Sequence, residues 1–225
     1  MIFYVKLKLA YSRDEELKPL IPLINNEIDN RGFELDLIKV KEDDIKFVVN
    51  DVDLFFSPLP LFSFLKLRVI TNASFVVESL WLRLKGNNSS SAFRLLVPGS
   101  NSTEYYLIKM LYPSHQQRNI VPVTKGEYDG EVSYEGGDID IYQMWKEGCG
   151  DLPIVIKVLS TIKLKEEEID RLKIVLRESA SKAIKEFGIS QYSKELGLKG
   201  RKSLECFFSL CKKKGICINV SYELF

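Results

Sequence analysis

The feature that most constrains the fold is the regular alternation of strand-like and helix-like segments along the chain. Residues 2–10 alternate apolar and polar side chains, as a half-buried strand does. The segment after Asp14 has apolar residues at helical spacing, and 33–40, 42–49 and 52–56 follow as strand, short polar helix and strand. This order predicts an open α/β sheet with parallel strands.

A second series of the same kind follows a β-rich stretch at 67–85 and the polar turn 86–91. Its predicted elements are strands at 93–97, 119–123 and 131–134 and helices at 102–111 and 140–147. The nearly continuous apolar strand 152–161 then has the character of a segment that crosses between domains. The chain continues with an amphipathic helix up to Phe187, a helix around 204–211 and a strand at 216–222.

These two series predict a two-lobed α/β fold, with a mixed sheet flanked by helices in each lobe. We place the first lobe at 1–75 plus 163–225 and the second, inserted lobe at 76–162. Two β-rich crossovers between lobes form a hinge with a cleft beside it. Ligands of α/β proteins bind near the carboxyl ends of strands and the amino ends of helices, so we expect the site in this cleft.

Composition excludes several classes of protein. Of the 225 residues, 45% are hydrophobic and 28% are charged, which is ordinary for a globular chain. No apolar run reaches the ~18 residues that a membrane-spanning helix needs. The formal charge of +1 does not favour nucleic-acid binding through phosphate contacts. The single histidine, His115, excludes a multi-histidine metal site, and no metal or cofactor is expected.

The cysteines and the N-terminal residues bear on location. The spacing of Cys149, Cys206, Cys211 and Cys217 lacks the paired pattern of a structural zinc site. A chain of this length does not need disulfides to hold its core, so most of these cysteines are predicted to be small core residues. The first sixteen residues lack the pattern of a secretion signal, and a cytoplasmic location is therefore expected.

The segment 97–104 is the strongest candidate for ligand binding. It combines a strand end, a tight turn and a helix start rich in hydroxyl groups, with Asn101 and Glu104 spaced as a variant capping box. Free amides at a helix start suit a carboxylate or phosphate, and an ordinary helix cap is the alternative. The candidate binding residues here are Gly99, Ser100, Asn101, Ser102 and Thr103.

Four further residues follow strands whose ends should face the cleft. Ser12 and Ser57 offer hydroxyl groups for a ligand oxygen, although strand-ending turns explain them equally. Tyr134 and Glu135 lie in a glycine-rich turn after a strand, where they could carry out acid–base chemistry. A solvated turn is the alternative. The basic run 194–214 is interpreted as a solvated face, with an acidic partner or nucleic acid as the alternative.

One run of residues resembles a known family. Asp140-Ile-Tyr-Gln-Met-Trp145, followed by Gly150-Asp-Leu152-Pro153, is similar to the D-L-G-x-x-W-x-x-x-x-G-L-P segment of futalosine-pathway menaquinone biosynthesis enzymes. That family includes chorismate dehydratase and 1,4-dihydroxy-6-naphthoate synthase.

Two further segments extend the resemblance over most of residues 1–165. The Val97-Pro-Gly turn with Ser102-Thr103 is similar to the family's V-P-G-x-x-T-T helix start, and Ser57-Pro58 matches an S-P step. The resemblance implies a type II periplasmic-binding-protein-like fold with a cleft at the hinge. It also implies that the protein is an enzyme that acts inside the cell on a small carboxylated ring compound.

Departures from the family pattern affect the chemistry more than the fold. Tyr134 stands where the naphthoate synthases carry the histidine thought to act as base, and a tyrosine with a pKa near ~10 is a poor base. Tyr142 replaces the glycine of D-L-G, and Asp151 is inserted before Leu-Pro. The resemblance therefore favours a chorismate-dehydratase-like elimination, in which Glu135 or Tyr134 handles the proton. The alternative is a non-catalytic protein of the same fold that binds a small anion or aromatic acid.

Overall fold

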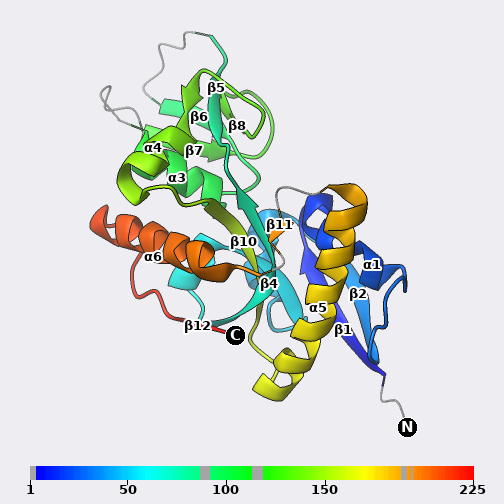
Figure 1. The fold of residues 1–225 in the computed structure, drawn as a ribbon. Helices are drawn as coiled ribbons and strands as arrows, with labels where there is room; N and C mark the ends of the chain where they lie inside the picture. Colours follow the sequence, from blue (N-terminus) through cyan, green and yellow to red (C-terminus); the bar gives the residue numbers. More distant parts are fainter. Residues whose placement is uncertain (1–3, 87–91, 113–118, 189–191, 194) are drawn as a thin grey trace.

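The computed structural model describes residues 4–86, 92–112, 119–188, 192–193 and 195–225, and its strands form two separate sheets (Figure 1). The larger sheet has the order β11-β4-β10-β3-β1-β2, with β12 also paired to β4. Its strands are β1 (Val5–Tyr11), β2 (Phe33–Lys39), β3 (Leu54–Pro58), β4 (Leu67–Val77), β10 (Ile154–Thr161), β11 (Tyr192–Ser193) and β12 (Tyr222–Leu224). Strand β1 runs parallel to β2 and β3, whereas β10 runs antiparallel to β3 and β4, so the sheet is mixed.

The smaller sheet is also mixed and has the order β7-β6-β8-β5-β9. Its strands are β5 (Trp81–Leu84), β6 (Ala92–Leu96), β7 (Asn119–Val123), β8 (Gly130–Ser133) and β9 (Ile139–Asp140). Strand β6 runs parallel to β7 and β8, and β5 runs antiparallel to β8 and β9. The predicted α/β fold with two mixed sheets and flanking helices is confirmed.

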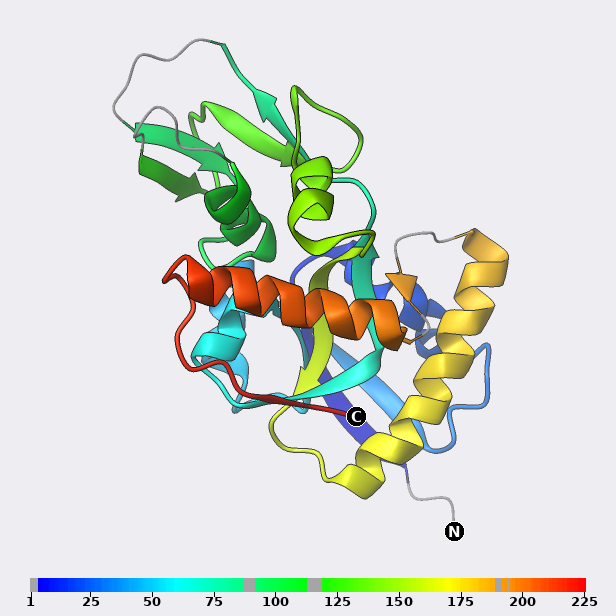
Figure 2. The ribbon, with the colours of Figure 1, turned by 60° about the vertical axis from the view of Figure 1, so that its left-hand side comes forward.

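Helices flank both sheets. They are α1 (Ile21–Ile24), α2 (Ile45–Val48), α3 (Thr103–Leu111), α4 (Ile141–Cys149), α5 (Glu166–Phe187) and α6 (Gly197–Lys213), with 3-10 helices η1 (Asp14–Leu20), η2 (Glu42–Asp44) and η3 (Leu59–Ser63). Below, the large lobe is the larger sheet with α1, α2 and α5, and the small lobe is the smaller sheet with α3 and α4. Helix α6 lies between the two lobes and contacts β10 and α3 (Figure 2).

Helix α5 packs on the large lobe through the apolar stripe expected from its sequence. Ile169, Leu172 and Leu176 are fully buried and share one core cluster with Leu9 and Phe56 of the sheet. Fully burying a leucine or isoleucine side chain contributes roughly 1.5–3 kcal/mol, so this stripe fixes α5 against the strands. Strand β10 is buried along its whole length, as an apolar strand in the middle of a sheet should be. Although β10 falls in the range predicted for the second lobe, it pairs with strands of the larger sheet. The exact boundaries between the lobes stay a prediction.

The segment after Asp14 differs from the amphipathic helix expected there. It forms η1 and then only four residues of α1, because Pro19 and Pro22 cannot donate helical hydrogen bonds. The Ser179 hydroxyl of α5 accepts from the Leu23 amide and donates to the Pro19 carbonyl, and so satisfies backbone groups that a regular helix would have paired. The closing strand is also shorter than expected: β12 covers only 222–224.

The cysteines form disulfides, which the sequence analysis did not expect, although Cys211 and Cys217 are buried in the core. Cys149 pairs with Cys206, and Cys211 pairs with Cys217. The first pair is 57 residues apart in sequence, so its proximity follows from the packing of α4 against α6 and not from any local spacing. Among the described residues, no helix has the length and apolar character needed to cross a membrane.

Candidate functional site

The two lobes meet at Arg13, which lies in the turn after β1. Its guanidinium Nη1 donates to Oε1 of Glu104, in the first turn of α3, at 2.7 Å, and lies 3.3 Å from the hydroxyl of Tyr134. The Tyr134 hydroxyl, which follows β8, also donates to Glu104 Oε1 at 2.5 Å. One arginine of the large lobe is thus held by two side chains of the small lobe.

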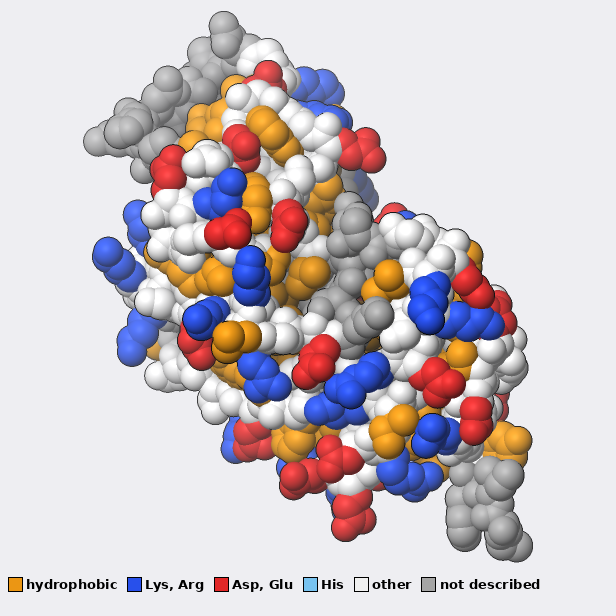
Figure 3. Space-filling view, viewed as in Figure 1, with side chains coloured by type: hydrophobic (Ala, Val, Ile, Leu, Met, Phe, Trp, Pro, Cys, Tyr) orange, Lys and Arg blue, Asp and Glu red, His pale blue; other side chains and the backbone are white. Residues whose placement is uncertain are grey.

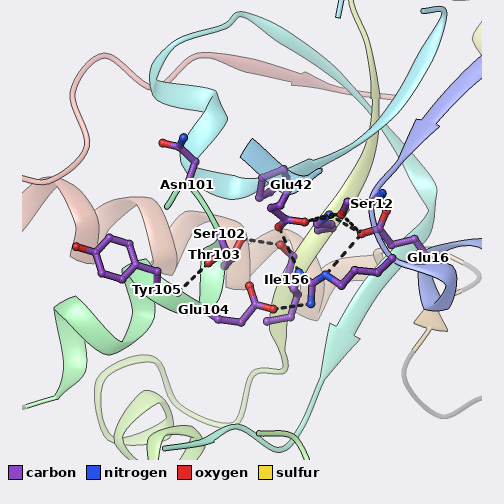
Figure 4. A network of polar contacts seen from close by, with 12 residues as sticks. Ser12, Glu16, Glu42, Asn101, Ser102, Thr103, Glu104, Tyr105 and Ile156 are labelled. Carbon is purple, nitrogen blue, oxygen red and sulfur yellow. Dashed lines mark hydrogen bonds and ion pairs between the residues drawn. The ribbon is translucent and has the colours of Figure 1, made fainter. Parts of the chain in front are cut away.

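A buried lysine contacts a second group of side chains beside Arg13. Lys157 lies on β10 between two shifts in the strand register, and its side chain is fully buried. Its ammonium contacts Glu16, Glu42 Oε2 at 2.5 Å and the Ser12 hydroxyl at 2.7 Å. Figure 4 shows Ser12, Glu16 and Glu42 converging on one point beside β10. Ser12 also donates to Glu42, so the predicted ligand-binding hydroxyl belongs to this network.

The network shifts the pKa values of its members. Burial alone would raise the pKa of Glu42, but the charges of Lys157 and then Arg13 outweigh it and lower that pKa. Burial would lower the pKa of Arg13, and the carboxylates of Glu104 and Glu42 raise it well above its usual range. Burial and the adjacent Glu104 charge raise the pKa of Tyr134, which therefore keeps its proton at neutral pH.

The network of buried charges also contains a carboxylate oxygen that has no hydrogen-bond partner. Glu16, Glu42 and Glu104 are buried carboxylates, and Arg13 and Lys157 are the cations that contact them. Within the described residues, Glu104 Oε2 is buried without a hydrogen-bond partner, and so is Arg13 Nε. The start of α3 favours a negative charge at Glu104 through the helix dipole.

Two cavities open on either side of Arg13, and both lobes line each of them. The first, of about 450 Å³, is lined by Ser12, Arg13, Lys41, Glu42 and Asp43 of the large lobe and by Pro98, Thr124 and Lys125 of the small lobe. The second, of about 430 Å³, is lined by Arg13, Glu15, Lys18 and Phe75 of the large lobe and by Val132, Ser133, Tyr134 and Glu135 of the small lobe. These volumes match sites for small organic molecules.

The predicted anion site at the start of α3 already holds a carboxylate of the chain itself. Asp43 accepts hydrogen bonds from the Ser100 amide at 3.0 Å, the Ser100 hydroxyl at 3.0 Å and the Asn101 amide at 3.2 Å. Gly99 lies directly against Glu42 and Asp43. These amides bind a negative group as their position suggested, but in this closed arrangement the group comes from the opposite lobe.

The other predicted hydroxyls near α3 have structural partners. Ser102, and not Asn101, is the N-cap: its side chain accepts from the Tyr105 amide at 3.3 Å, which corrects the predicted capping box. The Thr103 hydroxyl accepts from the Leu59 amide and donates to the Ile156 carbonyl. Ser57 is fully buried and donates to the Pro58 carbonyl. None of these three side chains lines either cavity described above.

Ser12, Tyr134 and Glu135 are the predicted residues that line the cavities, while Arg13, Glu16, Glu42, Glu104 and Lys157 were not predicted. One signal could have found Lys157: a single charge within an otherwise apolar buried strand requires buried partners. The carboxylates gave no such signal, because acidic residues at helix starts are common.

The family-like run at 140–153 has a structural explanation. Asp140 caps α4 by accepting from the Gln143 amide at 2.9 Å. The Trp145 indole is fully buried and donates to the Leu152 carbonyl at 2.9 Å. The run therefore fixes the turn between α4 and β10, where the chain returns to the larger sheet.

The comparisons with known proteins show the fold. No protein-family model matches the chain, and no curated protein matches it in sequence. Among solved structures, protein AF1704 from Archaeoglobus fulgidus is similar with a TM-score of 0.74 at 16% identity, covering 94% of this chain and 98% of that one. The alkanesulfonate-binding protein SsuA from Xanthomonas axonopodis pv. citri, bound to MOPS, is similar with a TM-score of 0.58 at 9% identity and covers both chains fully.

A third similar structure carries the fold name in its description. The Candida albicans CA3427 gene product, described as exhibiting the generic periplasmic binding protein structural fold, matches with a TM-score of 0.55 at 10% identity and covers 98% of both chains. This chain has a periplasmic-binding-protein-like fold.

The surface away from the two cavities carries charged side chains of both signs. Figure 3 shows basic and acidic side chains interspersed over one face, with basic ones gathered over the end of α6. Lys212 and Lys213 occupy the last turn of α6, where cations complement the helix dipole. His115 and Lys194 lie outside the described residues. In the described part of the chain, no group of His, Cys, Asp and Glu side chains could hold a metal ion.

Proposed function

We propose that this protein binds a small carboxylated molecule in the cavities between its lobes, with Arg13 as the residue that recognises the carboxylate. The observation that carries the proposal is that Arg13 lines both cavities while it bridges the lobes. Its side chain is 18% exposed, so it reaches the surface of the cavities that it lines. A planar guanidinium with five donors suits a carboxylate better than an ammonium does.

The lining of the cavities supports a ring compound with a negative group. Lys41 and Lys125 line the first cavity beside Arg13 and provide additional positive charge. In the second cavity, the Phe75 ring lies under the Arg13 guanidinium at 5.8 Å and packs edge-on against Tyr134. Aromatic walls of this kind favour a flat, partly apolar guest. The similar protein bound to MOPS, an alkanesulfonate-binding protein, accommodates an acidic small molecule in the same fold.

A thermal-shift and calorimetry screen tests the proposal. Benzoate, 2-naphthoate and chorismate are compared with the methyl esters of the same acids, which lack the charge. A carboxylate present at ~100 times its dissociation constant should stabilise the protein by about 2.7 kcal/mol, and its ester should not. R13K should weaken binding about tenfold or more, because lysine cannot form the bidentate contact.

K39M is the matched control, because Lys39 pairs with exposed Asp14 and lines neither cavity described above. Its affinity should equal that of the wild type. If no carboxylate raises the melting temperature, or if acids and esters act alike, the proposal is wrong.

A second candidate function is an elimination similar to that of chorismate dehydratase. The contact between Tyr134 and Glu104 favours it, since Tyr134 lines the second cavity and remains protonated. Glu135, which lines the second cavity beside Tyr134, would remove a proton from carbon, the C–H electron pair would form the double bond, and the C–O bond would break. The departing hydroxyl would take the Tyr134 proton and leave as water.

Incubation with chorismate, followed by mass spectrometry for loss of water, tests this second function. Turnover should disappear in E135Q and fall in Y134F, while K39M, at a position that lines neither cavity, should remain active. Chorismate binding without turnover would support binding alone.

A further inference from the structure

Helix α6 holds the point where the chain passes between the lobes. Residues 150–153, here called the hinge segment, join α4 of the small lobe to β10 of the larger sheet. The Ser203 hydroxyl of α6 donates to the Pro153 carbonyl at 2.6 Å, and Lys199 pairs with Asp151 at 3.3 Å. The disulfide Cys149–Cys206 joins the last residue of α4 to the middle of α6.

The other side of α6 is fixed to the large lobe by aromatic packing. Phe208 of α6 lies 5.2 Å from the ring of Phe62 in η3 and 5.5 Å from Tyr222 in β12. Phe62 and Tyr222 also pack edge to face at 5.2 Å. Because α6 is anchored in this way, a covalent bond from α4 to α6 also ties the small lobe to the large one.

Helix α6 makes three contacts at or directly beside the hinge segment: the disulfide, a hydrogen bond and an ion pair. The disulfide is the strongest of them. The ion pair between Lys199 and Asp151 is exposed, and exposed ion pairs contribute little to stability. A single hydrogen bond, such as that of Ser203, breaks and re-forms readily. The S–S bond is a covalent link between α4 and α6, and it limits a movement that carries α4 away from α6.

The two disulfides differ in accessibility. Cys149 and Cys206 are half-buried, whereas Cys211 and Cys217 are buried. A reductant must reach a sulfur atom to attack it, so the bond between α4 and α6 is the more reducible one on grounds of access. The Cys211–Cys217 bond closes a short local loop at the end of α6 and does not join the lobes.

We propose that the Cys149–Cys206 disulfide is a redox-operated restraint on opening of the cleft. When oxidised, it holds α4 on α6 and keeps the lobes closed. A dithiol reductant of the thioredoxin class supplies two electrons and two protons: the S–S bond breaks, Cys149 and Cys206 become thiols, and the dithiol becomes a disulfide. The small lobe then moves about the hinge segment, and the cavities beside Arg13 open.

The expected location of the protein determines the redox conditions to which this disulfide is exposed. Glutathione and thioredoxin keep accessible thiols reduced in the cytoplasm, whereas oxidising compartments preserve disulfides. A protein in the cytoplasm, as predicted from the sequence, would open easily under reducing conditions and become restrained under oxidative stress. The inference does not depend on the proposed ligand, since it concerns the closed protein alone.

Hydrogen exchange followed by mass spectrometry tests the restraint directly. The amides of Ser100 and Asn101 bond to Asp43 across the lobes, so they report whether the cleft is closed. The wild-type chain is treated with dithiothreitol until alkylation detects thiols at Cys149 and Cys206 while Cys211–Cys217 remains oxidised. Exchange in peptides covering 99–106 and 150–156 should then rise about tenfold, and C149S/C206S should show the same increase without reductant.

The double variant C211S/C217S is the matched control, because it removes a disulfide from the same helix without releasing the small lobe. Its exchange at 99–106 should equal that of the wild type. Unchanged exchange after selective reduction would overturn the proposal, as would equal increases in both double variants. Simultaneous reduction of both disulfides would also overturn it, because the reduction would then not be selective for Cys149–Cys206. If C149S/C206S does not fold, the reduced wild type decides the question.

Discussion

Gly99 of the small lobe and Asp43 of the large lobe are packed so closely that there is no room for a side chain between them. A Cβ on Gly99 would come within 2.8 Å of Asp43 Oδ1 and 2.9 Å of the Glu42 Cβ. The backbone amides of Ser100 and Asn101, in the turn before α3, also donate hydrogen bonds to Asp43 of η2. The closed position of the lobes therefore requires glycine at this point.

The variant G99A should push the lobes apart at this contact. Overpacking of this kind costs about 1–3 kcal/mol, so the free energy of unfolding in urea should fall by that amount. G148A is a suitable control, because a Cβ on Gly148 in α4 would meet its nearest neighbour at 4.0 Å. Alanine in a helix is favoured over glycine, so G148A should raise stability by about 0.5–1 kcal/mol. Equal stability of G99A and wild type would mean that the lobes do not close in this way.

The ion pair between Arg13 and Glu104 should show strong energetic coupling. R13M leaves Glu104 buried without its counter-charge and leaves Glu42 with Lys157 alone, and loss of one partner of a buried pair costs about 3–5 kcal/mol. E104Q removes one carboxylate from an acidic cluster and should cost less. In the double variant the losses should not add, with a coupling of about 1–3 kcal/mol in urea unfolding.

The control for this cycle is K39M, which removes a pair of equal length at an exposed site. Its effect should stay within about 0.5 kcal/mol. Additive losses in R13M and E104Q would show that the bridge between the lobes does not contribute to stability.

The sequence predicted the parts of this molecule that depend on local pattern. The strand and helix alternation predicted both mixed sheets, and the apolar run ending at Thr161 predicted a buried strand in β10. Ser12 and Tyr134, each following the end of a strand, line the two cavities, while their role in binding stays a prediction. Each of these features depends on periodicity or on the end of an element, which a single sequence contains.

Contacts between distant segments could not be predicted in the same way. Asp43 and Ser100 are 57 residues apart, and their meeting depends on how the lobes close. The pairing of Cys149 with Cys206 depends on the packing of two helices. The predicted anion site was therefore identified by its chemistry, while the carboxylate that fills it was missed.

The buried carboxylate of Glu42 should make stability depend on pH in acid. Lys157 and Arg13 lower its folded pKa, so the unfolded chain takes up a proton at a higher pH than the folded one. Its contribution is complete above the ordinary glutamate pKa of about 4.3 and is lost as the pH falls through the lower folded pKa. Urea midpoints between pH 7 and pH 3 should therefore fall more steeply for the wild type than for E42Q. E15Q, at an exposed position, should follow the wild-type curve; a slope in E42Q equal to that of the wild type would contradict the assignment.

The phenol of Tyr134 should stay protonated in alkaline solution for as long as the protein is folded. Burial and the Glu104 carboxylate raise its pKa well above the usual value, because ionisation would place a second negative charge beside the first. Spectrophotometric titration of phenolate formation in folded Y134F should therefore match the wild type in amplitude. A clear loss of amplitude in Y134F would show that Tyr134 ionises in the folded protein, and the hydrogen bond to Glu104 would then have to break as the pH rises.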